Sequence, residues 1–495
     1  MLFGRALGNI LPGLDYQDVY EEMEHFLVED QSTGKIGRDF FVRAVTPCSN
    51  YISVGSSENL TIQGEQSSAQ WIRVAFHDFI TANISAGTGG LDASIGFEAY
   101  RDENVGLAIN DTLNFFNPTV TAYLSMADNI ALGVIAAVST CGTTTTTPNI
   151  PLRFGRVDAD VAGPSGVPGP DTDLDETFKR FDKAGFNQSD AIALTVDGGQ
   201  PFDSTPTIFD TTVVNEYLDG TGQMGGPLIT TSDVGNRSDL RLYTSDANAT
   251  MHSLSTLSAF LPRCYSLFER MINTVPADVS LSEPVLPMMW KVENIYFDID
   301  ASGSPSVAGN IRYLHSPDEV PEHASYNITS AGGEPIVKTT GIVNATGYGL
   351  FGNMTFWHIN ETLSTPGSSV LSVTDVSYPL KDGILVLSPQ STWNQTLDYL
   401  SPVVIRAAAK TTLVAGTEQV TAQFWYPMQD ETNSRQFQRA TTNISLSEYG
   451  TAGDYTLYEG SFVLPITDSH PVAKIFIGDV SSRAVNVKSS FTVPS

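Results

Sequence analysis

Residues 71–79 read WIRVAFHDF, and helical spacing puts Arg73, Phe76 and His77 on one face of this segment. Cleavage of a peroxide needs a base that takes a proton from one oxygen and returns it to the other, and a fixed cation beside the charge that develops. His77 suits the first role and Arg73 suits the second. Taken alone, the motif is also compatible with a partly buried histidine that pairs with a neighbouring acid such as Asp78.

The pattern continues downstream with the segment GGLDAS at residues 89–94, and with Glu98 followed six residues later by Asn104. This order of motifs resembles the distal half of class II fungal haem peroxidases and their ascomycete relatives, which belong to the plant, fungal and bacterial peroxidase superfamily. The resemblance extends through four further stretches, MADNIALGVIAAVSTCG at 126–142, IPLRFGRVDA at 150–159, VPGP at 167–170 and FDKAGF at 181–186.

The resemblance implies a mainly helical haem-peroxidase domain over residues 15–286, with haem b as its cofactor. In that family the histidine transfers protons, the arginine stabilises the departing oxygen and the asparagine orients the imidazole. The implied catalytic residues are therefore His77 and Arg73. The implied supporting residues on the distal side are Phe76, which packs over the haem, Glu98 and Asn104.

The resemblance also implies a calcium ion beside the distal helix. Calcium takes about 6 to 8 hard oxygen ligands. The implied distal ligands are Asp78, the Gly90 carbonyl, Asp92 and Ser94. Cys48 and Cys141 match the disulfide of the family, and because the chain has three cysteines, Cys264 is then left as a free thiol.

On the proximal side, the chain lacks the histidine that the resemblance leads us to expect. In the family, the helix after the AGF turn ends in a histidine that binds the haem iron, and counting from Gly185 places that residue at 198 or 199. Both positions are glycine, Gly198 and Gly199, and the next motif, PFDSTPTIFD at 201–210, follows almost at once. The chain has therefore lost a contiguous segment, and no axial haem ligand is expected in it.

After the gap the resemblance resumes. It implies a second calcium site and the carboxylate that accepts a hydrogen bond from the axial imidazole. The implied calcium ligands are Asp203, Thr205, the Ile208 carbonyl and Asp210, and the implied carboxylate is Asp246. His252 lies off the helical face of Asp246, so we expect a solvated or packing role for it. Gln66 and Gln70 stand where manganese-oxidising relatives carry glutamates, so the usual manganese site is not expected.

Composition limits the partners of the chain. It has 55 acidic and 26 basic residues, and the formal net charge of −29 repels phosphate backbones and anionic lipid headgroups. No nucleic-acid partner is expected, and no membrane partner either, because no apolar run approaches the roughly 20 residues of a membrane helix.

The glycosylation pattern Asn-x-Ser/Thr occurs twelve times, which exceeds chance and favours a secreted, extracellular glycoprotein. The segment from Met1 to Gly13 is too interrupted for a secretory leader, which predicts a truncated or misassigned N-terminus.

Caps and periodicity predict the secondary structure on either side of Pro284. Helices are expected from a Ser125 cap to Cys141 and over 173–184, where Gly185 stops the second one. Beyond Pro284 the period changes to two, and strands are expected at 295–299, 384–387, 403–407, 422–426, 474–477 and 485–493. This pattern predicts an all-β, sandwich-like C-terminal domain over residues 290–495, of unknown role.

Two functions fit these observations. The first is a haem peroxidase that uses hydrogen peroxide to oxidise small aromatic donors, in the response to oxidative stress. The second is a catalytically impaired pseudoperoxidase, a calcium-stabilised binding protein whose C-terminal domain contacts a cell wall or polysaccharide. The gap before residue 201 distinguishes them. If a coding segment was wrongly removed, the natural protein is an enzyme, whereas a real gap leaves a chain that holds haem weakly or not at all.

Overall fold

A computed structural model describes residues 10–29, 37–52, 66–142, 150–194, 201–319, 322–330, 335–341, 344–363, 369–394, 400–416, 419–430, 433, 435–465, 471–487 and 491–492. The chain divides into two compact units. The first comprises residues 1–29, 36–285 and 430–437, and the second comprises residues 30–35, 286–429 and 438–495. No helix in the described ranges is both long enough and apolar enough to span a bilayer.

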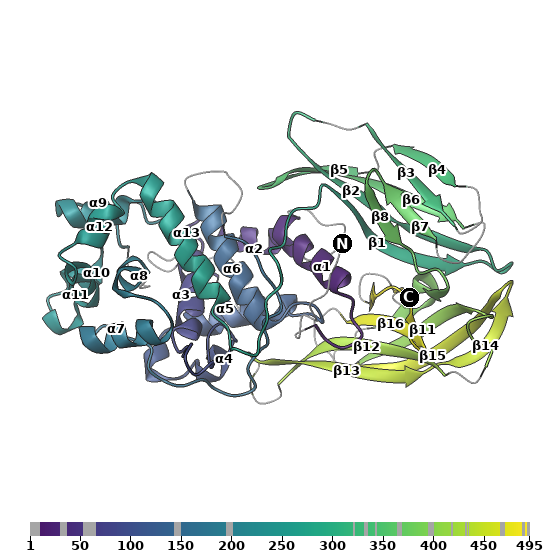
Figure 1. The fold of residues 1–495 in the computed structure, drawn as a ribbon, viewed down its shortest axis with the longest axis horizontal. Helices are drawn as coiled ribbons and strands as arrows, with labels where there is room; N and C mark the ends of the chain where they lie inside the picture. The colour runs from purple at the N-terminus through teal and green to yellow at the C-terminus, as the bar shows by residue number, and fades with distance from the viewer. Residues whose placement is uncertain are drawn as a thin grey trace. The chain divides into compact units, whose positions relative to one another are not determined.

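The first unit is helical, as predicted, and its part up to residue 285 runs from purple to teal in Figure 1. Its α-helices are α1 (Tyr16–Val28), α2 (Arg38–Val45), α3 (Ser67–Phe79), α4 (Ile95–Glu98), α5 (Ala108–Phe116), α6 (Met126–Cys141), α7 (Leu174–Lys183), α8 (Gln188–Ala193), α9 (Thr212–Asp219), α10 (Pro227–Thr230), α11 (Ser238–Thr244), α12 (Ala249–Ser253) and α13 (Leu257–Asn273). Short 3₁₀ turns lie at Asp102–Asn104, Asn117–Thr119 and Val234–Asn236.

Side-chain caps start the two helices that the sequence predicts most directly. The Ser125 hydroxyl accepts a hydrogen bond from the Asp128 backbone N–H at 3.0 Å, and the Asp173 carboxylate accepts one from the Glu176 N–H at 2.8 Å. Each cap satisfies a backbone donor that has no partner within the helix. Helix α7 ends before Gly185, whose φ of 85° suits a residue without a side chain. Both predicted helices are confirmed.

Aromatic side chains bury one face of α3. The ring of Trp71 lies 5.1 Å from that of Phe116 and 5.5 Å from that of Phe115, between centroids. Gly133 of α6 permits this approach, because a Cβ at that position would come within 2.6 Å of the Phe116 ring. The packing fixes the rotation of α3 and leaves its opposite face to the candidate site.

A buried ion pair and a disulfide hold α6 in place. The Arg156 guanidinium lies 2.8 Å from the Asp128 carboxylate, with exposed fractions of 0% and 1%. Arg156 also donates two hydrogen bonds, of 2.9 and 2.7 Å, to the carbonyl of Ile272 on α13. The predicted disulfide joins Cys48 to Cys141, the last residue of α6.

The second unit consists of antiparallel strands, green to yellow in Figure 1. They are β1 (Trp290–Ile299), β2 (Pro305–His315), β3 (His323–Thr329), β4 (Ile336–Gly341), β5 (Asn344–Gly349), β6 (Gly352–Thr362), β7 (Val370–Val373), β8 (Val376–Pro379), β9 (Ile384–Val386), β10 (Thr392–Trp393), β11 (Leu400–Lys410), β12 (Val420–Gln429), β13 (Phe437–Ser445), β14 (Ser447–Ala452), β15 (Tyr455–Pro465), β16 (Val472–Ile477), β17 (Val480–Ser481) and β18 (Val485–Asn486), with a 3₁₀ turn at Ser388–Gln390.

These strands form four sheets around two hydrophobic cores. The first core draws mainly on the sheets β1-β2-β6-β5 and β4-β3-β7-β8, and includes Trp357 and Ile311. The second draws on β10-β11-β15-β14, with β9 on β11, and on β13-β12-β16-β17, with β18 on β16, and includes Phe424 and Ile405. The predicted all-β class is confirmed, and two cores take the place of one sandwich.

The alternation predicted for the first strand holds only in its second half. Phe297 and Ile299 are buried, but Ile295 is half-buried. The pairing of β1 with β2 shifts register between Glu293 and Tyr296, and Asn294 adopts a φ of 52°. Such a bulge adds one residue to the strand, so the alternation of buried and exposed side chains is interrupted where it occurs.

Candidate active site and calcium loops

A chain of hydrogen bonds fixes His77, a buried residue on the face of α3 that lines a cavity. The Nε of Arg73 donates to Nε2 of His77 at 3.4 Å, while a terminal nitrogen of Arg73 donates to the Val105 carbonyl at 3.0 Å. Because Nε2 accepts, the imidazole proton resides on Nδ1, which donates to Oδ1 of Asn104 at 2.7 Å. The Asn104 amide nitrogen in turn donates to the Glu98 carbonyl at 2.9 Å. The structure thus brings together the residues predicted for the distal side.

The environment of His77 keeps its imidazole neutral near neutral pH. Burial lowers the pKa of His77 to about 4, and the positive charge of Arg73 acts in the same direction, while the hydrogen bond to Asn104 opposes them. A neutral imidazole with its proton on Nδ1 can take a proton only at Nε2, so a proton donor there would replace the long contact from Arg73.

A cavity of about 540 Å³ lies beside these side chains. Helix α3 lines it with Arg73, Phe76 and His77, and other walls come from the segment between Val167 and Leu174 and from α11. The Phe76 ring also packs against Phe181 of α7, 5.8 Å away between centroids. About half of the residues that line the cavity are polar or charged, so it suits a small molecule or cofactor that carries polar groups of its own.

The cavity suits the distal half of a haem site and lacks the axial half. Among the described residues that line it, His77 is the one imidazole. Gly198 and Gly199, where the axial ligand was expected, lie outside the described residues, and the sequence has no histidine between His77 and His252. His252 is exposed on α12, in keeping with the solvated role expected for it. The described residues that line the cavity therefore offer no imidazole besides His77.

Asp246, the expected partner of the missing imidazole, is only half satisfied. Its Oδ2 accepts hydrogen bonds from the backbone N–H and the hydroxyl of Thr250, at 2.9 and 2.6 Å. No described residue donates to its buried Oδ1. A buried acceptor without a donor costs free energy, so this oxygen has capacity for one more N–H.

The distal loop folds around the carboxylate of Asp78. One carboxylate oxygen accepts from the N–H groups of Asp92 and Ala93 at 3.0 and 2.8 Å, and the other accepts from the Ile95 N–H at 2.9 Å. The Ser94 hydroxyl lies 3.4 Å from the second oxygen, and the Ser94 N–H donates to the Asp92 carboxylate at 3.1 Å. Three of the four predicted ligands therefore share one set of contacts.

Gly90, the fourth predicted ligand, stands at the start of this loop in a conformation that requires glycine. Its φ is 114°, and a Cβ there would lie 2.5 Å from the Thr274 carbonyl oxygen.

Buried negative charge makes the distal loop suitable for a cation. Burial raises the pKa of Asp78 well above its usual value, and the charge of Asp92 adds to the effect. Burial likewise raises the pKa of Asp92. Two buried carboxylates beside hydroxyl and carbonyl oxygens are the donor chemistry that calcium prefers, and a divalent cation would offset their repulsion.

Glu98 acts on the distal side through its backbone, since its side chain is engaged elsewhere. Its carboxylate accepts a hydrogen bond from the Gly163 N–H at 2.7 Å and lies 3.0 Å from the Arg101 guanidinium. The carboxylate therefore anchors the loop at Gly163, and the Glu98 carbonyl holds Asn104.

The four residues predicted for the proximal calcium site form one compact turn. The Asp203 carboxylate accepts from the N–H and the hydroxyl of Thr205 at 2.7 and 3.2 Å, and the Ile208 N–H donates to the Thr205 carbonyl at 2.9 Å. Burial raises the pKa of Asp203, and the negative charges of Asp210 and Glu216 add to it. The oxygen donors suit calcium here too.

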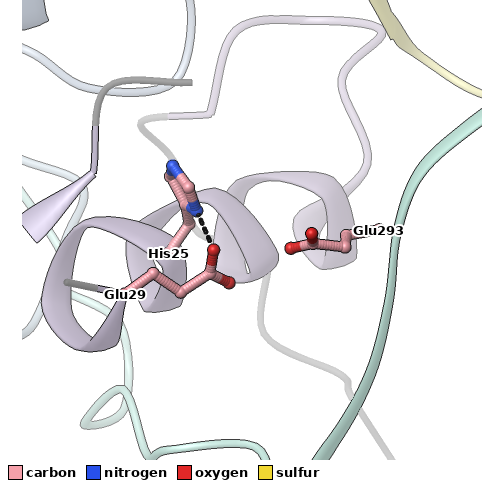
Figure 2. A group of neighbouring side chains, drawn as sticks. All are labelled: His25, Glu29 and Glu293. Carbon is pink, nitrogen blue, oxygen red and sulfur yellow. Dashed lines mark hydrogen bonds and ion pairs between the residues drawn. The ribbon is translucent and has the colours of Figure 1, made fainter. Parts of the chain in front are cut away.

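A buried histidine–carboxylate contact at the C-terminal end of α1 was not predicted from the sequence. Nδ1 of His25 lies 2.7 Å from a carboxylate oxygen of Glu29, and the two side chains are 5% and 0% exposed (Figure 2). Glu293, also labelled in Figure 2, belongs to β1 of the second unit. The signal that predicts the pair is a histidine and an acid four residues apart on one helical face.

Comparison with known proteins agrees with this geometry. Residues 56–203 match the protein family described as Peroxidase. A WSC domain-containing protein of Arthroderma benhamiae is 35% identical over 337 residues, which cover 62% of this chain and 44% of that protein. The putative L-ascorbate peroxidase 6 of Arabidopsis thaliana is 33% identical over 151 residues, covering 28% and 43%. Manganese peroxidase 2 of Phlebia radiata is 28% identical over 242 residues, covering 41% and 60%.

The chain spans roughly half the length of these relatives. The matched family region contains the Arg73–His77 face of α3, the distal loop and the hydrogen-bonded Asn104. Residues 56–203 of the helical unit are therefore similar to the peroxidase family.

Proposed function

We propose that the helical unit is a peroxidase domain that acts on hydrogen peroxide and oxidises small aromatic donors. The observation that carries this proposal is the hydrogen-bonded row of Arg73, His77 and Asn104 beside a cavity of about 540 Å³. The row lies inside the region that matches the peroxidase family.

Each member of the row has a distinct task in the proposal. Nε2 of His77 takes a proton from one peroxide oxygen and returns it to the other, because Nδ1 is already engaged by Asn104. The guanidinium of Arg73 stabilises the negative charge that develops on the departing oxygen. Asn104 is a positioning residue, since it holds the imidazole in the productive tautomer.

The missing axial ligand limits what this chain does with haem b, the cofactor that the resemblance implies. The described cavity residues offer no second imidazole, so we infer that haem binds weakly and that a free imidazole strengthens its binding. The Asp246 oxygen without a described donor supports this rescue, because it can accept the N–H of an imidazole placed nearby.

Calcium is the second part of the proposal. We infer one ion at Asp78, Gly90, Asp92 and Ser94, and one at Asp203, Thr205, Ile208 and Asp210. The support is the buried carboxylates of both loops, whose pKa values are raised by burial and by neighbouring negative charge. The twelve glycosylation patterns support an extracellular setting, where free calcium is plentiful.

The absence of a histidine at positions 198 and 199 favours a second candidate function. A chain that retains its calcium loops and loses its iron ligand is a pseudoperoxidase, with binding as its remaining role. In this version the β unit contacts a cell wall or polysaccharide, and the helical unit is a calcium-stabilised scaffold.

The first experiment measures turnover of the full chain, mixed with haem b and imidazole. Hydrogen-peroxide-dependent oxidation of a small phenol is followed by absorbance. His77→Leu is expected to lower the rate by about 10²- to 10⁴-fold, the usual contribution of a positioned acid–base group. His252→Leu, at an exposed histidine of the same unit, is the matched control and is expected to retain the rate.

Equal turnover by the His77→Leu and His252→Leu chains would reject the proposed role of His77. Absence of any turnover above free haem in the unaltered chain would favour the pseudoperoxidase.

A further inference from the structure

A turn far along the sequence contacts the distal loop within the first unit. Residues 430–437 cluster with the helices of that unit, and three of their side chains carry the contacts. We call Asn433, Arg435 and Gln436 the clamp residues. None of them belongs to the region that matches the peroxidase family, so the resemblance gives no reason to expect them near the site.

Gln436 holds the strained centre of the distal loop. Its side-chain nitrogen donates to the Ala93 carbonyl at 2.9 Å, and its exposed fraction is 2%. Ala93 lies between the proposed ligands Asp92 and Ser94 and has a φ of 59°, a left-handed conformation that is uncommon for alanine. Such a conformation persists only where its surroundings stabilise it. Gln436 is one of the groups that do so.

Asn433 contacts α4, the short helix that directly follows the distal loop. Its side-chain nitrogen donates to the Gly96 carbonyl at 2.9 Å, in the helix α4. The last residue of α4 is Glu98, whose carbonyl accepts from Asn104, and Asn104 orients His77. A displacement of α4 is therefore transmitted to the imidazole through two hydrogen bonds.

Arg435 fixes the clamp to the flanking segments. Its guanidinium donates to Oδ1 of Asn110 at 2.8 Å and to the hydroxyl of Tyr100, and it lies over the Tyr100 ring, 4.6 Å from the centroid. The Arg435 side chain also donates to Asn433 at 3.2 Å, so the clamp residues brace one another.

Close packing makes this contact specific. A Cβ added at Gly96 would come within 2.1 Å of the Gln436 side-chain nitrogen. Real Cβ contacts do not approach so closely, so alanine at position 96 would displace either Gln436 or α4. The observed position of the Gln436 side chain therefore requires glycine at position 96.

We propose that Asn433, Arg435 and Gln436 are positioning residues for the distal calcium loop and, through α4 and Asn104, for His77. The calcium part of this inference rests on the proposed function. The contact itself does not, because it can be tested with the metal removed.

The test is a double-mutant cycle in the full chain, with Gly96→Ala, Gln436→Ala and the two combined. Unfolding midpoints in chelator and calcium affinity by calorimetry are both measured. Gln436→Ala is expected to weaken calcium binding by about tenfold, the effect of one lost buried hydrogen bond. Gly96→Ala is expected to lower both quantities in the unaltered background and to have little further effect in the Gln436→Ala background, where its steric conflict is gone.

Gln438→Ala is the matched control, because Gln438 is exposed on β13 two residues from the clamp. It is expected to leave calcium affinity and the midpoint unchanged. Asn433→Ala provides a second variant if Gln436→Ala fails to fold, and it is expected to weaken calcium binding in the same direction.

The outcomes separate the clamp from the calcium proposal. Additive midpoint effects of Gly96→Ala and Gln436→Ala in chelator would overturn the clamp, whatever the metal does. Non-additive midpoints together with no calcium binding by the unaltered chain would support the contact and refute its calcium role. Unchanged calcium affinity in both Gln436→Ala and Asn433→Ala would likewise refute that role.

Discussion

Single side chains set the chemistry of the distal face. Arg73 donates to Nε2 of His77 and Asn104 accepts from Nδ1, so two neighbours define both the tautomer and the direction of one imidazole. The spacing of four residues along α3 predicts the first contact. The second contact depends on the turn at Asp102–Asn104, and the sequence predicted it only through the resemblance.

Burial determines the reactivity of Cys264. This thiol lies on α13 with an exposed fraction of 4%, and burial raises its pKa to about 12. The thiolate is the reactive form, so a disulfide reagent is expected to modify no cysteine in the native chain at pH 8 and one in the denatured, unreduced chain. Peptide mapping identifies the labelled residue. Label on Cys48 or Cys141 would contradict the disulfide.

The same thiol links stability to alkaline pH. The folded chain keeps its proton up to about pH 12, whereas an unfolded cysteine loses it near pH 8.5. The stabilisation is therefore complete below about pH 8.5 and is lost as pH rises toward 12, by about 1.4 kcal/mol for each pH unit. Urea unfolding at pH 8 and pH 10 should show a steeper loss in the native sequence than in Cys264→Ala. Parallel losses would show that Cys264 titrates normally.

The buried pair of Asp128 and Arg156 is expected to dominate local stability. Asp128→Asn leaves a guanidinium with 0% exposure unpaired, which typically costs about 3 to 5 kcal/mol. Glu176→Gln, which removes a partner of Lys179 and Arg180 near the surface of α7, is the control and should leave the midpoint unchanged. Equal effects of the two substitutions in denaturant unfolding would mean that the buried pair is not the stabilising contact proposed.

At the level of elements, local signals predicted more than distant contacts did. Caps at Ser125 and Asp173 identified α6 and α7, because a cap and its helix lie within a few residues of each other. The bulge in β1 was not predicted, since its cause is the pairing with β2 rather than its own alternation. The clamp was not predicted either, because more than 300 residues separate Gln436 from Ala93, as their sequence separation of 343 shows.

Calcium is expected to stabilise the helical elements around both loops. A ligand that binds the folded state alone adds about 2.7 kcal/mol at 100 times its dissociation constant. Scanning calorimetry of the full chain should give a lower unfolding midpoint for the helical unit in chelator than in calcium. The midpoint of the β unit should be the same in both. The β unit is the internal control. An unchanged profile would remove both calcium assignments.

Across the whole molecule, the sequence distinguished a helical half from a β half but not the organisation of the latter. The change from helical to alternating periodicity near Pro284 reflects local backbone preference, so it is visible without a structure. The division of the strands between two cores depends on which sheets face each other, and period-two patterns are the same in either arrangement. The strands predicted at 403–407 and 422–426 lie within β11 and β12.

We propose that this chain combines the distal residues Arg73, His77 and Asn104 with a proximal side that offers haem no axial histidine. Titration of the full chain with haem b, followed at the Soret band with and without imidazole, tests it most directly. We predict weak binding by the chain alone and binding at least about tenfold tighter with imidazole, because the added ring supplies an axial nitrogen donor. Tight, protein-ligated haem without imidazole would contradict the claim and reveal a ligand elsewhere in the chain.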